Sequence, residues 1–353
     1  MSQVTITIDG KNFTTEKGKT ILEVCRDNGI HVPTLCYHPR LRLVGACRVC
    51  VVEVQGARTL MTACTTPVDR DGMVVTTKSE RVVDARKMVV ELLLASGDHN
   101  CLYCEANGRC ELQDLVYELK IEYPRFPVDP PQWPRDDTNP MIFRDLNKCI
   151  LCGRCVRGCN EVQVNNVIDF GYRGSRAKIV TAYDKNYADS TCVFCGECVQ
   201  LCPTGALVEN KALFGGRPWQ ADVVSTTCPY CGTGCSLDLH IVDKKIVRIT
   251  GTENGTVNRG SLCVKGRFGY DFIHHEERLT TPLIKENGDF REATWDEALD
   301  LVARRFTEIE ETSGADSIGA LSSARCTNEE NYLMQKFMRA VIGTNNVDHC
   351  ARL

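Results

Sequence analysis

The sequence predicts an α+β fold that is divided into several small domains. Residues 3–29 read as a strand, a hairpin turn, a second strand and a short helix, which is a compact α+β order. The chain has 353 residues, which is enough for two or three domains. Its 22 cysteines occur in CxxC groups along the chain, and a chain of this length is not a small secreted disulfide scaffold.

The composition argues against two classes of protein. The chain has 42 Lys and Arg residues against 46 Asp and Glu residues, whereas a nucleic-acid-binding protein usually presents a basic face. Its longest apolar run, residues 88–95, contains Glu91 and is far shorter than the roughly 20 residues that span a bilayer. The first residues do not resemble a signal peptide. We therefore expect a cytoplasmic protein with no membrane span and no nucleic-acid partner, in which reduced thiols serve as ligands.

The first elements are indicated by alternation and by capping residues. Residues 3–9 alternate apolar and polar side chains, as a half-buried strand does, and the Asp-Gly pair that follows predicts a hairpin turn. Thr20 and Glu23 form a capping-box pattern that begins a short helix, and the Asn-Gly pair at residues 28–29 ends it.

A proline-rich stretch separates these elements from the later ones. Apolar residues recur at helical spacing over residues 79–96, which predicts a second helix. Residues 124–140 hold six prolines and predict an extended linker or a strap. Short strands are expected at residues 237–242 and 246–249, and a capping box begins a last helix over residues 294–311.

The first cysteine group is Cys36, Cys47, Cys50 and Cys64, with the spacing C-x10-C-x2-C-x13-C. Plant-type [2Fe–2S] sites have the spacing C-x4-C-x2-C…C, so the first loop is longer here. The strand, hairpin and helix before the group are the scaffold expected for such a site. Zinc is the alternative, because one CxxC pair also suits zinc.

The second group is His99, Cys101, Cys104 and Cys110. Three cysteines at C-x2-C-x5-C with one histidine suit a [4Fe–4S] cube that has one imidazole ligand. Such a ligand lowers the negative charge around the iron and generally raises the potential. A zinc site with the same four ligands remains the alternative, and the cysteines are firmer candidates than the histidine.

The third and fourth groups are two copies of the run C-x2-C-x2-C-x3-C, offset by 43 residues. In two-cluster bacterial ferredoxins the fourth cysteine of each run binds the cluster of the other run. We therefore expect a crossed arrangement. One cube takes Cys149, Cys152, Cys155 and Cys202, and the other takes Cys192, Cys195, Cys198 and Cys159.

The fifth group is Cys228, Cys231, Cys235 and Cys263, for which the spacing favours iron–sulfur over zinc. The groups together predict one [2Fe–2S] and four [4Fe–4S] clusters, about 18 iron atoms. A chain with this many one-electron centres is expected to conduct electrons. The remaining cysteines, Cys25, Cys326 and Cys350, have no ligand spacing and are expected to be structural.

The motifs resemble known families. TILEVCRDNGIHVPTLCYHPRL, GDHNCLYCEANGRCELQ and the double run are similar to an arm shared by the large subunit of respiratory complex I, multi-cluster [FeFe]-hydrogenases and formate dehydrogenases. CPYCGTGC…LCVKGRFG resembles the cluster motif of molybdenum or tungsten bis-pterin (bis-MGD) oxidoreductases. The segment ARCTNEENYLMQKFMRAVIGTNNVDHCARL is similar to the catalytic (alpha) subunits of cytoplasmic NAD(P)-linked formate dehydrogenases. The histidine spacing, H-x-C, departs from the more common H-x3-C.

The resemblance implies a domain plan. The expected parts are a plant-type [2Fe–2S] ferredoxin (β-grasp) domain at 1–78, a [4Fe–4S] domain with one histidine and three cysteine ligands at 79–120, a Pro-rich linker at 121–140, a bacterial 2×[4Fe–4S] ferredoxin domain at 141–212, a [4Fe–4S] Mo/W-bis-MGD-type domain at 222–280, and the start of a molybdopterin oxidoreductase domain at 281–353.

The resemblance also implies a function, namely oxidation of formate to CO2 with electrons passed through five clusters. The acceptors would be flavin- and NAD(P)-binding subunits like those of complex I, or ferredoxin or hydrogenase subunits, because the chain has no GxGxxG fingerprint. Lys265 matches the lysine between the last cube and the nearer pterin. The catalytic selenocysteine or cysteine is expected to follow Leu353, so we expect this chain alone not to oxidise formate. The alternative is a non-catalytic electron-transfer subunit of a complex I-like or hydrogenase complex.

Overall fold

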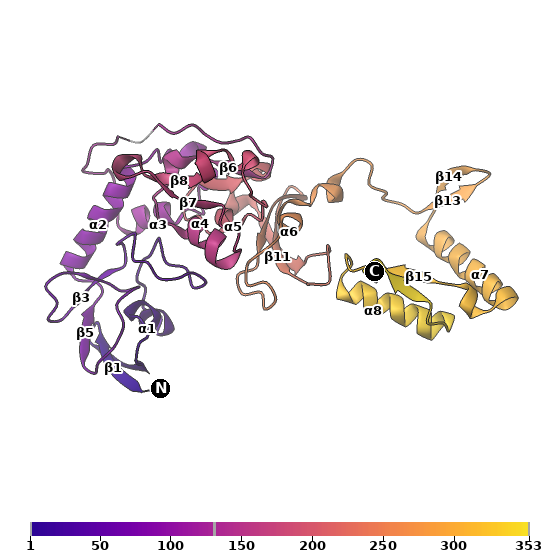
Figure 1. Ribbon diagram of the computed structural model, residues 1–353, viewed down its shortest axis with the longest axis horizontal. Helices are drawn as coiled ribbons and strands as arrows, with labels where there is room; N and C mark the ends of the chain where they lie inside the picture. The colour runs from indigo at the N-terminus through magenta and orange to yellow at the C-terminus, as the bar shows by residue number, and fades with distance from the viewer. Residues whose placement is uncertain (1, 130–131, 352–353) are drawn as a thin grey trace. The chain divides into compact units, whose positions relative to one another are not determined.

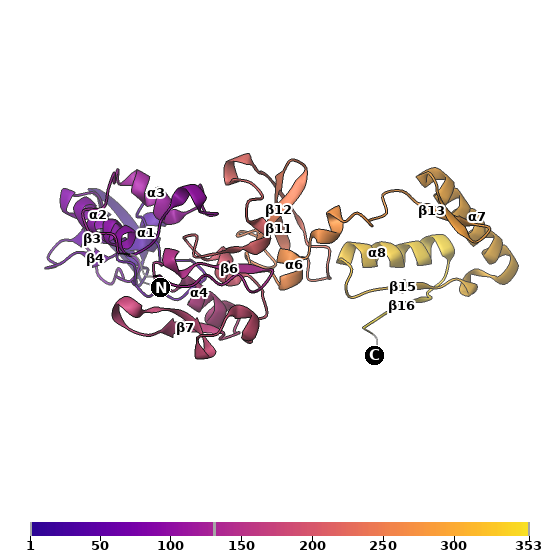
Figure 2. The ribbon, with the colours of Figure 1, turned by 90° about the horizontal axis from the view of Figure 1, so that it is seen from above.

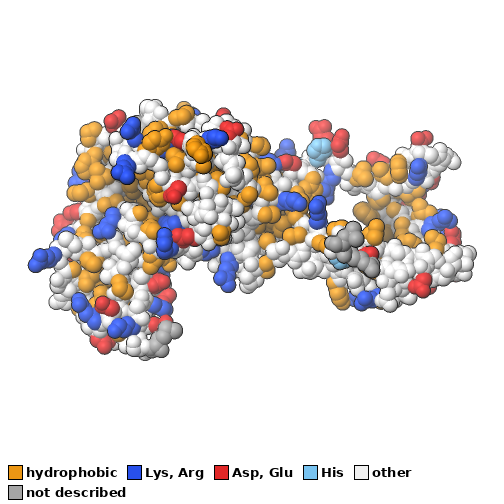
Figure 3. Space-filling view, viewed as in Figure 1, with side chains coloured by type: hydrophobic (Ala, Val, Ile, Leu, Met, Phe, Trp, Pro, Cys, Tyr) orange, Lys and Arg blue, Asp and Glu red, His pale blue; other side chains and the backbone are white. Residues whose placement is uncertain are grey.

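The computed structural model describes residues 2–129 and 132–351 and divides the chain into two compact units, Met1–Ala221 and Asp222–Leu353 (Figure 1). Among the described residues, no helix is long and apolar enough to cross a membrane. Acidic and basic side chains intermingle on the face shown in Figure 3, in keeping with the net charge of −4.

The first unit opens with a five-stranded mixed sheet in the order β2-β1-β5-β3-β4. Strand β1 pairs antiparallel with β2 and parallel with β5, which is the β-grasp arrangement of two hairpin-linked strands and a returning partner. The predicted strand and turn at residues 3–10 are confirmed. The strands are β1 Gln3–Ile8, β2 Lys11–Glu16, β3 Val51–Val54, β4 Met61–Thr62 and β5 Met73–Thr76.

Helix α1, Ile21–Asp27, begins where the capping box predicted. The Thr20 hydroxyl accepts from the Glu23 amide, and the Glu23 carboxylate accepts from the Thr20 amide, so two helix-end donors are satisfied. The helix buries one face, including Cys25, against the sheet. Cys25 is fully buried there, which confirms a packing role for it.

Two further helices of the first unit pack against its cysteine-bearing segments. Helix α2, Glu80–Ala95, begins at the N-cap Ser79 and confirms the helix predicted over 79–96. Helix α3, Glu111–Glu118, lies beside α2 in both views (Figures 1 and 2). One apolar core contains residues of both helices together with cysteines of the first and third groups, so these groups pack against shared side chains. Its buried members include Cys36, Cys47, Val90, Leu112, Leu115 and Cys152.

The proline-rich stretch is a strap rather than a free linker. Its described part has no helix or strand, and Pro130 and Pro131 lie outside the described residues. The side chain of Asn147 accepts from the Trp133 amide at 2.7 Å and donates to the Trp133 carbonyl at 2.9 Å. These bonds fix the stretch to the segment that leads into the third cysteine group.

The tandem cysteine runs fold alike. Leu151 and Phe194 both have φ of 52°, and Gly153 and Gly196 have φ of 70° and 73° immediately before a short helix. Glycine adopts this left-handed conformation without steric cost, so both copies trace the same path around their sulfurs. The helices are α4 Arg154–Arg157 and α5 Glu197–Gln200; the strand pairs are β6 Ile142–Arg144 with β9 Leu207–Glu209 and β7 Ile168–Gly171 with β8 Lys178–Thr181.

The second unit begins with a three-stranded antiparallel meander, β10-β11-β12. The strands predicted near residues 237–249 are confirmed as β11 Ser236–Val242 and β12 Lys245–Gly251. Strand β10, Asp222–Thr227, was not predicted, because all six of its side chains are exposed and its sequence has no clean apolar alternation. Helix α6, Val264–Phe268, follows the last cysteine of the fifth group.

The rest of the second unit pairs helices with two small sheets. The helix predicted over 294–311 is confirmed as α7, but its capping box forms only half. The Thr294 hydroxyl accepts from the Glu297 amide, whereas the Glu297 carboxylate instead binds Arg291. The elements are β13 Leu283–Glu286, β14 Asp289–Glu292, α7 Trp295–Ser313, β15 Ala320–Ser322, α8 Asn328–Phe337 and β16 Val347–His349.

Candidate iron–sulfur centres

The first cysteine group is assembled beside the β-grasp sheet. The Cys36 thiol is hydrogen-bonded to Cys47 and Cys64, and the Cys50 thiol is hydrogen-bonded to Cys64. All four side chains are buried. Hydrogen bonds from Cys47 and Cys64 lower the pKa of Cys36 below its ordinary value. The four sulfurs therefore form one connected set, as ligands of a single centre must.

Backbone bonds hold this group in place. The Leu22 amide of α1 donates to the Ala63 carbonyl, and the Ala63 amide donates to the Cys50 carbonyl, both at 2.9 Å. From α2, the buried Arg86 guanidinium donates to the Val51 carbonyl at 2.9 Å. Both helices thus fasten the chain on either side of the sulfurs.

The second group surrounds the start of α3. Cys110 is the N-cap of that helix, and its thiol interacts electrostatically with Cys101 and Cys104 on the preceding turn. Burial raises the pKa of Cys110 to about 12. The structure thus brings the three predicted cysteines of this group together.

His99 is half-buried, and its backbone carbonyl accepts from the Cys101 thiol at 3.4 Å. Its Nε2 donates to the Leu93 carbonyl at 3.1 Å, and burial lowers its pKa, which favours the neutral ring. Histidines that bind metals typically donate their other ring N–H to a carbonyl or a carboxylate. The arrangement leaves Nδ1 as the nitrogen that can act as a ligand.

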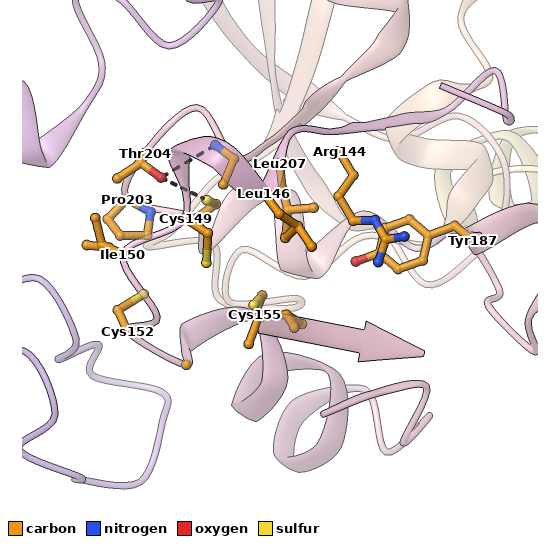
Figure 4. Close-up of a pocket in the computed structure, with 14 residues that line it drawn as sticks. Arg144, Leu146, Cys149, Ile150, Cys152, Cys155, Tyr187, Pro203, Thr204 and Leu207 are labelled. Atoms are coloured by element: carbon orange, nitrogen blue, oxygen red, sulfur yellow. Dashed lines mark hydrogen bonds between the residues drawn. The ribbon is translucent and has the colours of Figure 1, made fainter. Parts of the chain in front are cut away.

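The third group lines a cavity with the last cysteine of the fourth. Cys149, Cys152 and Cys155 come from the first run and Cys202 from the second, and all four line the same cavity. The first three point toward one another in Figure 4. This is the crossed set that the sequence predicts. Apolar side chains such as Ile150 close the cavity. Burial raises the pKa of Cys149 and of Cys152 to about 12.

One polar side chain that lines this cavity supports the fit of a cluster. Tyr187 is 1% exposed, its ring lies under the Arg144 guanidinium at 4.8 Å, and it lines the same cavity. Its buried hydroxyl has no hydrogen-bond partner among the described residues, and leaving such a group unpaired costs about 1–3 kcal/mol. The sulfur of a bound cluster would accept this hydrogen bond. The four thiols and the hydroxyl together suit a [4Fe–4S] cube.

The hydroxyl of Tyr187 leads to a testable prediction. The Tyr187 hydroxyl interacts electrostatically with Cys198 and Cys155, one from each crossed set. We expect Tyr187→Phe to keep its iron and to lower the reduction potential of a tandem-run cube, because hydrogen bonds to cluster sulfurs raise potentials. Losing a hydrogen bond worth about 1 kcal/mol would lower the one-electron reduction potential by about 40 mV. The measurement is a redox titration followed by electron paramagnetic resonance (EPR). Tyr183→Phe is the matched control, since Tyr183 is 93% exposed. Equal potentials in the two variants would contradict the assignment.

The fourth group mirrors the third. The Cys198 thiol interacts electrostatically with Cys195, Cys192 and Cys159, which is the second crossed set, and also with Cys202 of the first. Burial raises the pKa of Cys198 well above its ordinary value. The two crossed sets are therefore neighbours.

The fifth group lies in the second unit between β10, β11 and α6. The Cys228 amide donates to the Cys235 carbonyl at 2.8 Å, and Cys235 interacts electrostatically with Cys228, Cys231 and Cys263. A hydrogen bond with Thr233 lowers the pKa of Cys231, and the ammonium of Lys265 adds to the effect. Lys265 thus lies close enough to influence the group electrostatically.

Other residues singled out in the sequence lie elsewhere. Cys326 is half-buried. Cys350 is exposed, with its sulfur 3.4 Å from the Ser323 hydroxyl, and its structural role stays a prediction. Leu353 lies outside the described residues. Sequence reasoning missed Tyr187, because an isolated tyrosine carries no ligand spacing.

Five family profiles match consecutive parts of the chain. They are the 2Fe-2S iron-sulfur cluster binding domain at residues 1–80, the NADH-ubiquinone oxidoreductase-G iron-sulfur binding region at 86–125, the 4Fe-4S dicluster domain at 148–206, the molybdopterin oxidoreductase Fe4S4 domain at 221–275, and molybdopterin oxidoreductase at 278–353.

Individual proteins are similar over nearly the whole chain. The subunit alpha of an NADPH-Fe(3+) oxidoreductase from Geobacter sulfurreducens is 41% identical over 99% of this chain and 40% of its own. A Staphylococcus aureus (strain USA300) protein, whose name assigns it provisionally to the formate dehydrogenases, is 33% identical over 98% of this chain and 39% of its own. The chain therefore spans about two fifths of the length of these curated relatives.

A solved structure is similar to part of the chain. In the crystal structure of an NAD+-reducing [NiFe]-hydrogenase, one chain is 32% identical with a TM-score of 0.57. The match covers 60% of the present chain and 90% of that chain.

Proposed function

We propose that the chain, which matches the Fe4S4 and molybdopterin profiles of the molybdopterin oxidoreductases, is the electron-transfer portion of a formate dehydrogenase catalytic subunit. In this proposal, electrons released from formate at a molybdenum or tungsten pterin centre pass along five clusters. The electrons are then transferred to a flavin- and NAD(P)-binding partner or to ferredoxin. The chain covers only part of its relatives, so the whole-protein activity is part of the proposal.

The observation that best supports this proposal is a cavity lined by Cys149, Cys152, Cys155 and Cys202. Four cysteines from two separate runs, two of them buried, line one cavity, which structural zinc from a single CxxC pair would not require. When bound, iron–sulfur clusters supply one-electron carriers. The role of these residues is to hold each cluster by four side chains and to exclude water from it.

Each centre would have four protein ligands. The [2Fe–2S] centre would be held by Cys36, Cys47, Cys50 and Cys64. The cubes would be held by His99, Cys101, Cys104 and Cys110; by the two crossed sets; and by Cys228, Cys231, Cys235 and Cys263. Lys265 would lie between the last cube and a pterin, where its cation stabilises nearby negative charge.

The assignment to formate is supported by a name and by a motif. The similar Staphylococcus aureus protein carries a formate dehydrogenase name, and residues 324–353 resemble that family. A second candidate is an electron-transfer subunit without its own substrate site, which is favoured by the likeness to an NAD+-reducing hydrogenase.

Metal analysis of native protein tests the proposal. We expect about 18 iron atoms per copy of this region, molybdenum or tungsten, and bleaching of the cluster absorbance on addition of formate. Full iron without molybdenum or tungsten, and without a response to formate, would favour the second candidate. Zinc in place of iron would overturn both.

A further inference from the structure

The loop between Cys36 and Cys47 has ten intervening residues, where plant-type ferredoxins have four. This extended loop contacts the double-cluster domain of the same unit. Arg40 forms an ion pair at 2.8 Å with Glu197 of α5, whose side chain is 1% exposed. The Arg42 amide donates to the Glu161 carboxylate at 2.9 Å. The added length therefore fastens the first cysteine group to the tandem runs.

One buried arginine lies at the centre of this junction. Arg157 of α4 is 6% exposed, and its Nη2 donates to the Cys36 carbonyl at 2.6 Å and to the Cys152 carbonyl at 3.3 Å. Its Nη1 donates to the Arg42 carbonyl at 2.5 Å, and its Nε donates to the Gly153 carbonyl at 3.2 Å. One nitrogen thus bridges two candidate ligand residues that belong to different centres.

The chemistry of these contacts sets Arg157 apart from its neighbour Arg154. Arg154 donates to both oxygens of the Glu111 carboxylate, so its charge is matched by an anion. The four hydrogen bonds of Arg157 all end on backbone carbonyls. Burying a cation whose only partners are carbonyl dipoles costs desolvation free energy unless an anion lies close by. Thiolate-ligated clusters on both sides would supply that negative charge.

We propose that Arg157 is a positioning residue that joins the [2Fe–2S] centre to the adjacent cube and raises the reduction potentials of both. The inference rests on the proposed function, because it needs clusters in the first and third groups. Its cation favours the reduced, more negative state of each centre. Its two hydrogen bonds fix Cys36 against Cys152 and give a short bonded path between them. One electron leaves one centre and enters the other, with no proton or atom transferred.

The test uses three variants of the iron-loaded protein. Arg157→Gln removes the cation. Arg157→Lys keeps a cation but lacks the planar guanidinium whose N–H groups reach several carbonyls. Arg42→Gln is the matched control. Arg42 lies in the same loop, and its side chain is 80% exposed. The control variant therefore removes an exposed cation but keeps the backbone carbonyl that accepts from Arg157. The measurements are iron content, redox titration, and the EPR spin coupling of the two reduced centres.

We expect Arg157→Gln to make reduction of both centres about tenfold less favourable, about 59 mV for one electron, with the other clusters unchanged. Arg157→Lys should show less than half of that shift and weaker spin coupling, while Arg42→Gln should match the wild type. Unchanged potentials in an iron-loaded Arg157→Gln, or an equal shift in Arg42→Gln, overturn the proposal. If Arg157→Gln does not fold, unchanged spin coupling in Arg157→Lys overturns it. Absence of iron from the wild type would instead overturn the proposed function.

Discussion

Replacing Cys202 with serine is expected to remove the cube of the first run and to leave the cube of the second run in place. Cys202 belongs to the second run in sequence, yet it lines the cavity of Cys149, Cys152 and Cys155. Iron content should fall from about 18 to about 14 atoms per chain. This is the largest effect that we expect from one side chain, because a whole cofactor is lost.

Double variants separate crossed from uncrossed ligation. If ligation is crossed, adding Cys149→Ser to Cys202→Ser removes no further iron, because both cysteines serve one cube. Adding Cys192→Ser should remove a second cube and lower the count to about 10 atoms. Uncrossed ligation predicts the reverse outcome for the two pairs. Cys326→Ser, outside every group, should keep full iron.

Replacing Gly251 with alanine is expected to destabilise the second unit severely. A Cβ at this position, the last residue of β12, would overlap the Gly260 carbonyl oxygen and would lie 2.5 Å from the carbonyl carbon. These are backbone atoms of the loop that leads to Cys263, so no side-chain rotation relieves the clash. We expect a loss of about 3 kcal/mol in the free energy of unfolding, the upper range for overpacking.

The same variant should damage the fifth cysteine group. Displacing the backbone near Gly260 moves Cys263 relative to Cys228, so about four iron atoms should be lost from this site alone. Chemical denaturation and iron analysis of the variant provide the measurements. Gly319→Ala is the control, because its Cβ would meet atoms only at 3.7 and 3.9 Å. Wild-type stability in Gly251→Ala would refute the argument.

Local signals in the sequence predicted much of the fold. Thr20 and Glu23 set the start of α1, because caps act within a single turn, and the apolar spacing over residues 79–96 predicted α2. The tandem spacing predicted that Cys202 joins the first run, and Cys202 does line the cavity of Cys149, Cys152 and Cys155, while its ligation of a cluster stays a prediction. These features depend on residues that are close in the chain or on a repeated motif.

Features that depend on distant contacts could not be predicted. Glu297 completes the capping-box pattern in sequence, but Arg291 from the β13–β14 hairpin takes its carboxylate. Arg157 shows no motif, and its role depends on a contact with Cys36, which lies 121 residues earlier in the chain. The hydroxyl of Tyr187 became notable only when its burial and lack of a partner among the described residues were visible.

The crossed arrangement of the two runs has a consequence for biosynthesis. As the ribosome releases the chain from its N-terminus, Cys149, Cys152 and Cys155 emerge well before Cys202. Neither cube would have its full ligand set until the second run has been synthesised, because each needs one thiolate from the other run. Each inserted cube would then cross-link two distant segments and shorten the loops open to the unfolded chain, which favours the folded domain. If ligation is crossed, cofactor insertion would be a late step that cross-links the two runs.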